Sequence, residues 1–583
     1  MTYWKIIFTR SRLLLAAILI LAFALRMWGI NYGLPFSHEN ASGVRYVNIA
    51  ARMGGTFNFN AHYISGGITH GVIHYILLFE YGLYFIIGRL TGSLSSVKEF
   101  SYMFIKDPTV FLQMGAYTSV VTGLLTILFL YFAGKRLSGK AAGLAAAFLL
   151  ALSPMFTQES HLISADNLFM LWFTISLFYC IRVLQEGKSG DYVLAGVFAG
   201  IGIVTKILAG AAVLSLLTAH ILRYTGNTGN TGNTGKYAEG KERLIGKKIL
   251  LGLLSVGLGM IIADPYIILD FKYWIKTFFY LMTFHAASGW VAPPVNEWGF
   301  YLKTVLNDGG VPLTLLFAAS LILAARRRAK EDLLLFTFPL LYYPAMAVLK
   351  STGDRYLMPV FPFLYLLAAR FLVWLLDRQG IRPIFRKAML AMLLIILCIS
   401  PLSKIALQDY RMSNSNTREI AARWIEENIP SGSKLLLDSF SPVLNDTREN
   451  IQNKYEAAVK YNFAKKDYYK LQLETLSGNT YDLAYIKGVI HPSVPYEKDK
   501  YELMQKHEDV GQGLDYIKSK GYEYIIVADW DYGIYLTKEG RAFAPKQAEF
   551  YDSLDAGCRL SKEIRPDPRK NLGPVIKIYS TRS

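Results

Sequence analysis

Residues 13–30 read LLLAAILILAFALRMWGI, and this run decides the fold class of the chain. It is long and apolar enough to cross the hydrocarbon core of a bilayer as a helix. Lys5, Arg10 and Arg12 precede it, as in a secretory signal peptide, but no small-residue cleavage site follows and many further apolar runs do. We therefore predict that residues 13–30 form the retained first helix of a polytopic membrane protein.

The composition supports a polytopic membrane protein and argues against a nucleic-acid-binding protein. The chain has 583 residues, is 52% hydrophobic and carries a net charge of +18. Nearly all of that charge lies in residues 1–410, because residues 411–583 hold 26 Lys and Arg against 25 Asp and Glu. A charge confined to the membrane half argues against a nucleic-acid partner. Cys180, Cys398 and Cys558 are too few and too dispersed to predict a disulfide framework or a thiolate metal site.

The basic residues predict the orientation of the spans. They cluster in short loops near residues 135–140, 182–188, 223–248, 326–328 and 378–387. Under the positive-inside rule these loops are cytoplasmic. Parity then predicts about eleven spans, with the N-terminus inside and the C-terminal part outside: 13–30, 111–133, 141–157, 167–184, 191–205, 207–223, 248–263, 311–325, 332–349, 356–376 and 388–407. The predicted location is the plasma (inner) membrane.

Residues 68–87 are also apolar enough to span, but a crossing there would reverse the side of every basic loop. We therefore predict that the first outer loop, residues 31–110, lays helices along or into the outer interface. Their wetter face is expected to carry Glu80, His70 and His74.

The chain changes character at residue 411. Residues 1–410 form the predicted membrane domain, with a low-complexity Asn-Thr-Gly repeat in a cytoplasmic loop at 224–247. Residues 411–583 are charged and alternate helical stretches with short apolar strands, for example Thr417–Asn428, Leu435–Leu437 and Tyr524–Val527. The predicted fold class is an all-α polytopic membrane protein of about 11 transmembrane helices with a C-terminal extracytoplasmic α/β domain.

Polar residues collect on the predicted outer face. Five loops supply them: Glu39; Glu159, Ser160, His161 and Asp166; Lys206; Asp264, Asp270 and His285; Lys350, Asp354 and Arg355. Polar groups at membrane depth are costly unless they pair or function, so their concentration on one face indicates a site. The plainer interpretation is that loops carry charges in any protein and each residue is a solvated cap. Carboxylates beside cations suit transfer of a group from a phosphate-linked donor, since a carboxylate accepts a proton and Lys or Arg neutralises phosphate.

Short motifs in order along the chain resemble a known family. They are LRMWG at 25–29 with YGLP at 32–35, ESH at 159–161 with Asp166, GIVTK at 202–206, DPY at 264–266 and GDRYLMP at 353–359. In these motifs the chain resembles the lipid-linked-sugar glycosyltransferases of the GT-C superfamily, in particular the branch similar to protein O-mannosyltransferases and the aminoarabinose transferase of lipid A. The similarity covers most of the membrane half.

The resemblance implies transfer of a sugar, with inversion, from a polyprenyl-phosphate donor to a lipid, glycan or protein acceptor outside the cytoplasm. Family members carry an Asp-Glu pair in the first outer loop, with the Asp as base. Here residues 37–40 read SHEN, so Glu39 is the nearest carboxylate and the candidate base. By the same resemblance Asp166 is the second acidic position, which orients the acceptor or binds a metal.

The remaining candidate roles also come from the resemblance. Lys206 and Arg355 resemble phosphate-facing cations, and Lys350 is a further candidate. His161 and His285 are candidates to assist, although an interfacial His is more often structural. Glu39 and Asp166 are also candidate ligands for a divalent metal ion, but no ligand spacing demands one.

Two other interpretations stay open. The first is a catalytically altered family member that binds lipid-linked glycans, which the sequence SHEN favours. The second is a polytopic transporter or flippase, which would be expected to place ionisable residues near the bilayer midplane in interrupted helices or repeated halves. The predicted charges instead crowd the outer ends of the spans.

Overall fold

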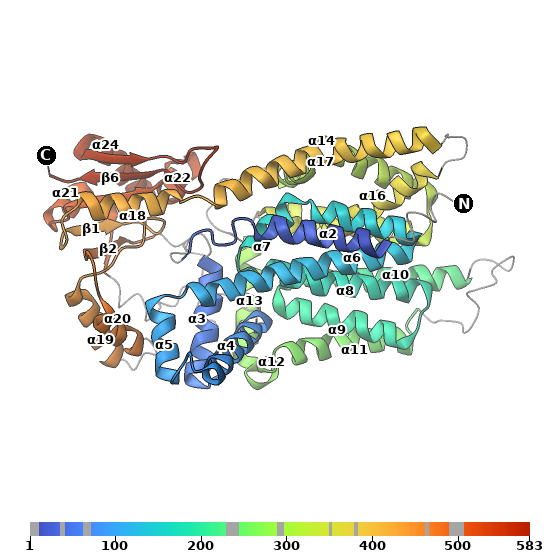
Figure 1. Cartoon of the computed structure of the whole chain (residues 1–583), viewed down its shortest axis with the longest axis horizontal. Coiled ribbons are helices and arrows are strands. Elements are labelled where there is room, and N and C mark those ends of the chain that lie inside the picture. Colours follow the sequence, from blue (N-terminus) through green and yellow to red (C-terminus); the bar gives the residue numbers. More distant parts are fainter. Residues whose placement is uncertain are drawn as a thin grey trace.

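The computed structural model describes residues 11–34, 41–61, 71–228, 244–287, 297–348, 353–377, 383–460, 466–488 and 506–582. Long helices run side by side along the longest axis, and a sheet with its own helices lies at one end (Figure 1). We call the end of the bundle that faces this sheet the sheet-side end, and the other the opposite end. The predicted combination of a mostly helical membrane part and a C-terminal α/β region is confirmed.

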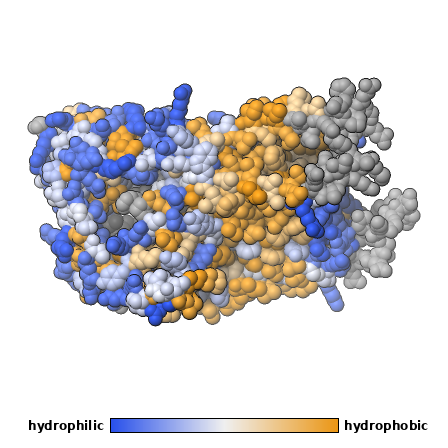
Figure 2. All heavy atoms as spheres, in the orientation of Figure 1, coloured by the Kyte–Doolittle hydropathy of each residue, from blue (hydrophilic) through white to orange (hydrophobic). Residues whose placement is uncertain are grey.

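The bundle is built from the apolar runs of the sequence. Its helices are α2 Ser11–Met27, α6 Thr109–Ala151, α8 Ala165–Gln185, α9 Ser189–Thr205, α10 Ala212–Thr228, α11 Lys247–Ala263, α14 Glu297–Arg327, α15 Lys330–Val348, α16 Phe361–Leu376 and α17 Pro383–Met412. Figure 2 shows a broad hydrophobic band over these helices, with a hydrophilic surface beyond it at the sheet side. Such a band is what a protein immersed in a bilayer presents to lipid. The chain is an integral membrane protein.

Seven helical segments of the described chain are long and apolar enough to cross a membrane: Gly71–Thr91, Thr109–Ala151, Ala165–Gln185, Ile207–Thr225, Trp298–Arg327, Asp354–Leu376 and Met392–Asn428. The helices α2, α9 and α11 have 17 residues each and are too short for that criterion. The number of spans, predicted from the sequence as about eleven, therefore stays a prediction.

Helix α6 contains the predicted spans 111–133 and 141–157, joined by a sharp turn. The chain leaves the helical conformation at Ser138 and Gly139, and Gly139 has φ +83°, a left-handed value that favours glycine. The second half ends at Ala151 rather than at 157. The reason is local, because a new helix, α7 Pro154–His161, starts there with Ser153 as its cap and a proline in its first turn.

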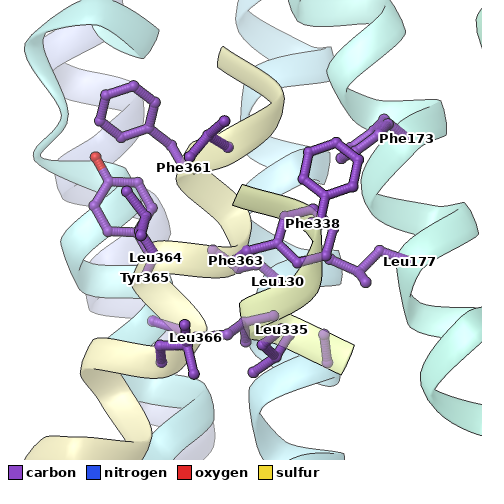
Figure 3. Packing of buried hydrophobic residues seen from close by; sticks show 14 of the residues in the cluster. Leu130, Phe173, Leu177, Leu335, Phe338, Phe361, Phe363, Leu364, Tyr365 and Leu366 are labelled. Carbon is purple, nitrogen blue, oxygen red and sulfur yellow. The ribbon is translucent and has the colours of Figure 1, made fainter. Parts of the chain in front are cut away.

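Buried aromatic side chains join α8, α15 and α16. The rings of Phe338 and Phe363 stack with centroids 4.2 Å apart, and Phe173 meets Phe338 edge-on at 5.4 Å (Figure 3). All three side chains are almost fully buried. This packing fixes the helices that carry the candidate site residues at their ends.

Glycines allow α9 and α11 to lie very close together. A Cβ on Gly196 would stand 2.1 Å from the carbonyl oxygen of Gly252, and one on Gly259 would stand 2.1 Å from that of Val197. Small residues at such contacts are typical of helix pairs in membranes. The contact holds the end of α9, which leads into Lys206, against its neighbour.

The described part of the predicted outer loop contains three helices: α3 Ala41–Thr56, α4 Gly71–Thr91 and α5 Val97–Lys106. In Figure 1, α3 and α5 run across the direction of the long helices. Helix α4 exposes large apolar side chains, including Phe79 and Leu90. Its Glu80 accepts a hydrogen bond from Thr118 of α6. The prediction of a wet surface for His74 is wrong, because this residue is fully buried against Tyr46; His70 lies outside the described residues.

The C-terminal region holds a six-stranded sheet with the order β3-β2-β1-β4-β6-β5. The strands are β1 Lys434–Leu437, β2 Asp482–Ile486, β3 His507–Glu508, β4 Tyr524–Ala528, β5 Arg559–Ile564 and β6 Ile576–Ser580. The first four are parallel and the last two antiparallel. The flanking helices are α18 Thr417–Asn428, α19 Arg448–Lys460, α20 Lys466–Thr475, α21 Leu514–Ser519, α22 Asp529–Leu536, α23 Lys538–Phe543 and α24 Pro545–Gly557. The helix and the two strands quoted from the sequence are confirmed as α18, β1 and β4.

This region contacts the bundle at two places. Arg411, in the last turn of α17, donates a hydrogen bond to the carbonyl oxygen of Pro568. On the other side, Tyr102 of α5 donates to the carboxylate of Glu474 in α20. The sheet is therefore joined to the bundle through α17 and through an outer-loop helix.

Candidate active site

Asp166 lies in the first turn of α8 at the sheet-side end of the bundle. Ser164 caps this helix, and its Oγ accepts a hydrogen bond from the backbone N–H of Asp166 at 3.0 Å. A carboxylate in this position interacts favourably with the positive end of the helix dipole. The side chain is almost fully buried, with 4% of the residue exposed. Its negative charge therefore requires a partner.

Lys206 supplies that partner. It follows Thr205 directly, where the extended backbone at φ −159° ends α9, and its Nζ forms an ion pair with Asp166 Oδ1. Only 13% of the Lys206 side chain is exposed. The same Nζ lies 5.6 Å from the ring centre of Phe169 and 5.5 Å from that of Tyr356. Aromatic faces at this distance stabilise a cation that is largely shielded from water.

Glu159 of α7 joins the pair through a shared hydroxyl group. Ser164 Oγ lies 2.9 Å from Glu159 Oε2 and 3.2 Å from Asp166 Oδ2, so its single proton serves one carboxylate at a time. Burial and the charge of Asp166 raise the pKa of Glu159 above its ordinary value, against the opposing effects of Arg355 and Lys206. Two neighbouring carboxylates of this kind hold a proton more tightly than either would alone.

Arg355 belongs to the short 3-10 helix η3, Asp354–Val360, and is exposed. It is close enough to Glu159 and Asp166 to interact electrostatically with both. It nevertheless forms no ion pair with a described residue. The adjacent Asp354 does not neutralise it by a direct contact but accepts a hydrogen bond from Thr304 Oγ1 at 2.7 Å. The guanidinium donors of Arg355 thus remain available to an anion.

Tyr46 of α3, a helix of the predicted outer loop, lies near Asp166. The residue is 6% exposed, and its ring meets that of His74 edge-on at 5.5 Å. Burial and the charge of Asp166 raise the pKa of Tyr46. Helix α3 begins at Ala41, so the segment that contains Glu39 enters the helix that delivers Tyr46.

The other predicted site residues lie elsewhere or cannot be placed. Glu39 and Lys350 are outside the described residues, and so is the side chain of His285, although its backbone belongs to α13, Phe271–Ala287. His161 points away from Asp166. Its Nε2 lies 2.8 Å from the carbonyl oxygen of Trp28 and 3.6 Å from Asp409 Oδ1.

The two acidic residues that follow α11 contact the outer-loop helices. Tyr75 of α4 lies 3.5 Å from Asp264 Oδ1, and Asn60 donates to Asp270 Oδ2 at 3.1 Å. Partial burial raises the pKa of Asp264. These carboxylates are thus bonded to α4 and to the segment after α3.

A metal centre was a further candidate. Within the described ranges, no group of three or more His, Cys, Asp or Glu side chains could hold a metal ion. Asp166, one of the two candidate ligands, already forms an ion pair with Lys206. A site that uses Glu39 stays a prediction.

Sequence reasoning placed Glu159 among the outer-face polar residues without giving it a role, and it did not select Tyr46 or Tyr356 for the site. Glu159 and Tyr356 stand inside motifs that were recognised, so a signal existed for both. Tyr46 carries no comparable signal, because packing of α3 against the bundle alone brings it to Asp166, 120 positions further along the chain.

Comparison with known proteins adds a family and a fold. The model of the family described as dolichyl-phosphate-mannose-protein mannosyltransferase matches residues 113–231, a segment that includes Asp166 and Lys206. A sequence search of the curated proteins finds no match.

Among solved structures, ArnT from Cupriavidus metallidurans is similar with a TM-score of 0.50 and 14% identity, over 99% of this chain and 98% of that one. These values hold for ArnT in the apo state and for ArnT bound to undecaprenyl phosphate. The oligosaccharyltransferase of Archaeoglobus fulgidus is similar with a TM-score of 0.49 and 12% identity, over 92% of this chain and 72% of that one. At this identity the likeness to ArnT establishes the fold alone.

Proposed function

We propose that the chain transfers a sugar, with inversion, from a polyprenyl-phosphate donor to an acceptor outside the cytoplasm. The premise is the confirmed resemblance to GT-C glycosyltransferases of the O-mannosyltransferase and ArnT kind. Transferase activity fits the family whose model matches residues 113–231. The ArnT structure bound to undecaprenyl phosphate supports a lipid phosphate as the donor class. The acceptor would be a lipid, a glycan or a protein.

One observation carries this proposal: a buried carboxylate–ammonium pair, Asp166 with Lys206, stands beside a second carboxylate and an exposed guanidinium that has no ion pair with a described residue. A leaving phosphate needs cations, and an attacking hydroxyl group needs a proton acceptor. Both kinds of group are present within one cluster. A purely structural network would be expected to pair its arginine directly.

The proposed roles follow from exposure and pairing. Arg355 and Lys206, with Lys350 as a further candidate, bind the donor phosphate and neutralise the charge that develops on it. Arg355 makes the first contact because it is exposed, whereas Lys206 is held by Asp166. His285 remains a candidate to assist at the same phosphate.

The transfer itself is a single displacement. The acceptor oxygen attacks the anomeric carbon from the face opposite the phosphate, the bond from that carbon to the phosphate oxygen breaks, and its electron pair leaves with the lipid phosphate. The hydroxyl proton passes to a carboxylate. Glu39 is our first candidate for this base, and Asp166 orients the acceptor. Glu159 is a second candidate, since the raised pKa of its carboxyl group brings it closer to neutral pH, where a general base is most effective.

The orientation in the membrane is part of the proposal. Basic residues of the described loops, such as Arg136, Arg182 and Arg327, lie at the opposite end of the bundle, so the positive-inside rule would put the candidate site and the C-terminal region, residues 411–583, outside the cytoplasm. Residues 1–410 would then form the transferase domain, with the loop 224–247 in the cytoplasm. The host membrane would be the plasma (inner) membrane.

The test is transfer by the purified protein in lipid nanodiscs, with a panel of polyprenyl-phosphate sugars and candidate acceptors. We expect transfer by the wild type from at least one donor and a loss of roughly 100-fold or more in Glu39→Gln, the range of a missing general base. Glu331→Gln, in the first turn of α15 at the opposite end, is the matched control. Equal rates for the two variants would remove Glu39 as the base, and no transfer from any donor would contradict the proposed activity.

A second function has one observation in its favour. The sequence SHEN at 37–40 lacks the expected Asp, which suits a protein that binds lipid-linked glycans without transferring them. Donor binding without transfer by the wild type, lost in Arg355→Ala, would support this alternative over the enzyme.

A further inference from the structure

Three ionisable side chains, those of Arg26, His161 and Asp409, are buried together where α2, α7 and α17 meet at the sheet-side end. The His161 and Asp409 side chains are 0% and 1% exposed, and Arg26 is 1% exposed. None of the three belongs to the cluster around Asp166. Burying ionisable groups costs free energy, so we expect these three side chains to hold a specific arrangement of the helices.

The contacts within this group are specific but incomplete. Arg26 Nη1 donates to the carbonyl oxygens of Ala22 and Ala151, both at 3.2 Å. Arg26 Nε and both carboxylate oxygens of Asp409 have no hydrogen-bond partner among the described residues. Arg26 interacts electrostatically with Asp409 at longer range, and His161 Nε2 lies 3.6 Å from Asp409 Oδ1.

The surrounding backbone is shaped to receive these side chains. A Cβ on Gly123 of α6 would lie 3.0 Å from Ser160 Oγ and 3.4 Å from Arg26 Nε, so α6 packs closely against both α7 and Arg26. Gly29, after α2, has φ +83°, and a Cβ there would lie 3.1 Å from the carbonyl oxygen of Asp409. The turn after α2 and the end of α17 are therefore in close contact at this group.

Helix α7 connects this group to the candidate active site. His161 and Glu159 are two residues apart, so their side chains leave the helix on opposite faces. His161 faces Asp409, and Glu159 faces Ser164 and Asp166. A shift of His161 would therefore also move Glu159.

The start of α7 is held separately. Asp308 of α14 accepts hydrogen bonds from Ser153 Oγ at 2.8 Å and from the backbone N–H of Met155 at 2.9 Å, and its other oxygen accepts one from Tyr365 at 2.9 Å. Asp308 is thus saturated with partners, whereas Asp409 at the other end of α7 is not. The end of α7 next to Glu159 is held by His161, whose Nε2 lies 2.8 Å from the carbonyl oxygen of Trp28 and 3.6 Å from Asp409 Oδ1, and by Asn167, which donates to Ser160 Oγ at 2.9 Å.

Asp409 also marks the junction with the C-terminal region. It lies three residues before the end of α17, and Arg411 two residues later donates to Pro568 of that region. One buried group thus joins three parts: the first membrane helix, the helix that carries Glu159, and the helix that leads to the sheet.

We propose that Arg26, His161 and Asp409 are positioning residues for the transfer reaction, which together hold α7 so that Glu159 keeps its place beside Asp166. The idea rests on the proposed function. It assigns His161 a role through Asp409 instead of a contact with the phosphate. Lys206 follows α9 and Arg355 belongs to η3, so we expect donor binding not to depend on this group.

The experiment compares Asp409→Asn with Asp332→Asn in purified, nanodisc-embedded protein. Asp332 accepts from Arg370 at 2.7 Å, has a 4% exposed side chain and lies at the opposite end, so it is a matched buried ion pair remote from the site. For Asp409→Asn we expect kcat to fall by about 10-fold or more and the KM for the donor to stay within about 2-fold, as for a displaced reacting group. For Asp332→Asn we expect kcat per folded molecule to change less than about 2-fold. Equal kcat values for the two variants would overturn the proposal.

Backbone hydrogen exchange of residues 154–161 supplies a readout that needs no activity. We expect faster exchange there in Asp409→Asn and in His161→Gln but not in Asp332→Asn. Unchanged exchange in both site-side variants would overturn the proposal. If the wild type transfers no sugar from any donor, the proposed function fails, and the exchange data still decide whether the group positions α7. Should Asp409→Asn not fold, the double variant Arg26→Gln/Asp409→Asn removes both charges and is expected to fold while keeping the low kcat and fast exchange.

Discussion

At the opposite end of the bundle, one carboxylate, that of Glu186, is contacted by three cations: Arg136, Arg182 and Lys188. At the sheet-side end, Arg355 lies near Glu159 and Asp166 but forms no ion pair with a described residue. The first group uses its charges to hold helices together. The second keeps a guanidinium in a carboxylate field with its donors available, which is the arrangement that a phosphate ligand requires. Charge pairing, more than charge content, distinguishes the two ends.

The largest expected effect is that of Asp166→Asn. The change removes the carboxylate that neutralises Lys206 and leaves a mostly buried ammonium group unpaired, besides removing the acid proposed to orient the acceptor. We expect transfer to fall by roughly 100-fold or more, the range for loss of a group that acts in proton transfer or orientation. The measurement is the rate of sugar transfer in nanodiscs.

Asp191→Asn is the matched control for that change. Asp191 Oδ1 forms an ion pair with Arg182 Nε, 2.7 Å away, at the opposite end, and its side chain is 4% exposed. Asp191→Asn should lower the melting temperature without lowering the rate of sugar transfer per folded molecule. If both variants lose activity to the same extent, the distinction between the two ends is wrong.

Arg355→Ala is expected to have the next largest effect, and on the donor. Because Arg355 is exposed and has no ion pair with a described residue, we expect it to contribute to phosphate binding more than to folding. The KM for the polyprenyl-phosphate donor should rise by about 10-fold or more, the loss expected for a charge-assisted, bidentate contact. The melting temperature should stay close to that of the wild type.

Arg355→Lys sharpens this prediction. Lysine keeps the charge but not the planar fork of donors, so it should restore the affinity only in part. Full recovery would show that charge alone matters there, and an unchanged KM in Arg355→Ala would place the phosphate elsewhere.

The pH dependence tests Glu159. Burial and Asp166 raise the pKa of its carboxyl group in the folded chain, so the folded state binds this proton more tightly than the unfolded state. Its contribution to stability is therefore present at low pH and is lost as pH rises through the raised pKa. Glu159→Gln, which mimics the protonated form, should be more stable than the wild type at neutral pH and equal to it in acid. Thermal unfolding at several pH values measures this difference.

Activity should depend on pH in the opposite sense. If ionised Glu159 accepts the acceptor proton, transfer falls as pH drops through the raised pKa, and Glu159→Gln removes this acidic limb together with most of the rate. An acidic limb that persists in Glu159→Gln would belong to another carboxylate, with Glu39 as the first candidate.

The sequence predicted the parts of this molecule that depend on local patterns. Long apolar runs located the helices, and the alternation of helix and strand located α18, β1 and β4. It also selected Asp166 and Lys206, 40 residues apart, through a family resemblance. It could not predict that Lys206 would be held by Asp166, since that contact depends on how α8 and α9 pack.

Long-range packing also explains the differences at His161, His74 and Tyr46. His161 stands in a recognised motif, but a helix presents residues two positions apart on opposite faces, so only Glu159 faces Asp166. His74 was predicted to lie on the wetter face of an interfacial helix, yet it is fully buried against Tyr46 of α3. Neither outcome follows from residue type or spacing in the sequence.

The smallest expected effect is that of Ser164→Ala. Ser164 caps α8 and places one hydroxyl group between Glu159 and Asp166. Loss of the cap should cost about 1 kcal/mol of stability. Loss of the shared proton should raise the pKa of Glu159 further, since a hydrogen bond to its ionised form disappears. Ser96→Ala, which removes the cap of α5 away from these carboxylates, is the control. Both variants should lose similar stability in thermal unfolding, whereas only Ser164→Ala should shift the acidic limb of the pH–rate profile of transfer towards higher pH. If neither variant shifts that limb, the hydroxyl group only caps the helix.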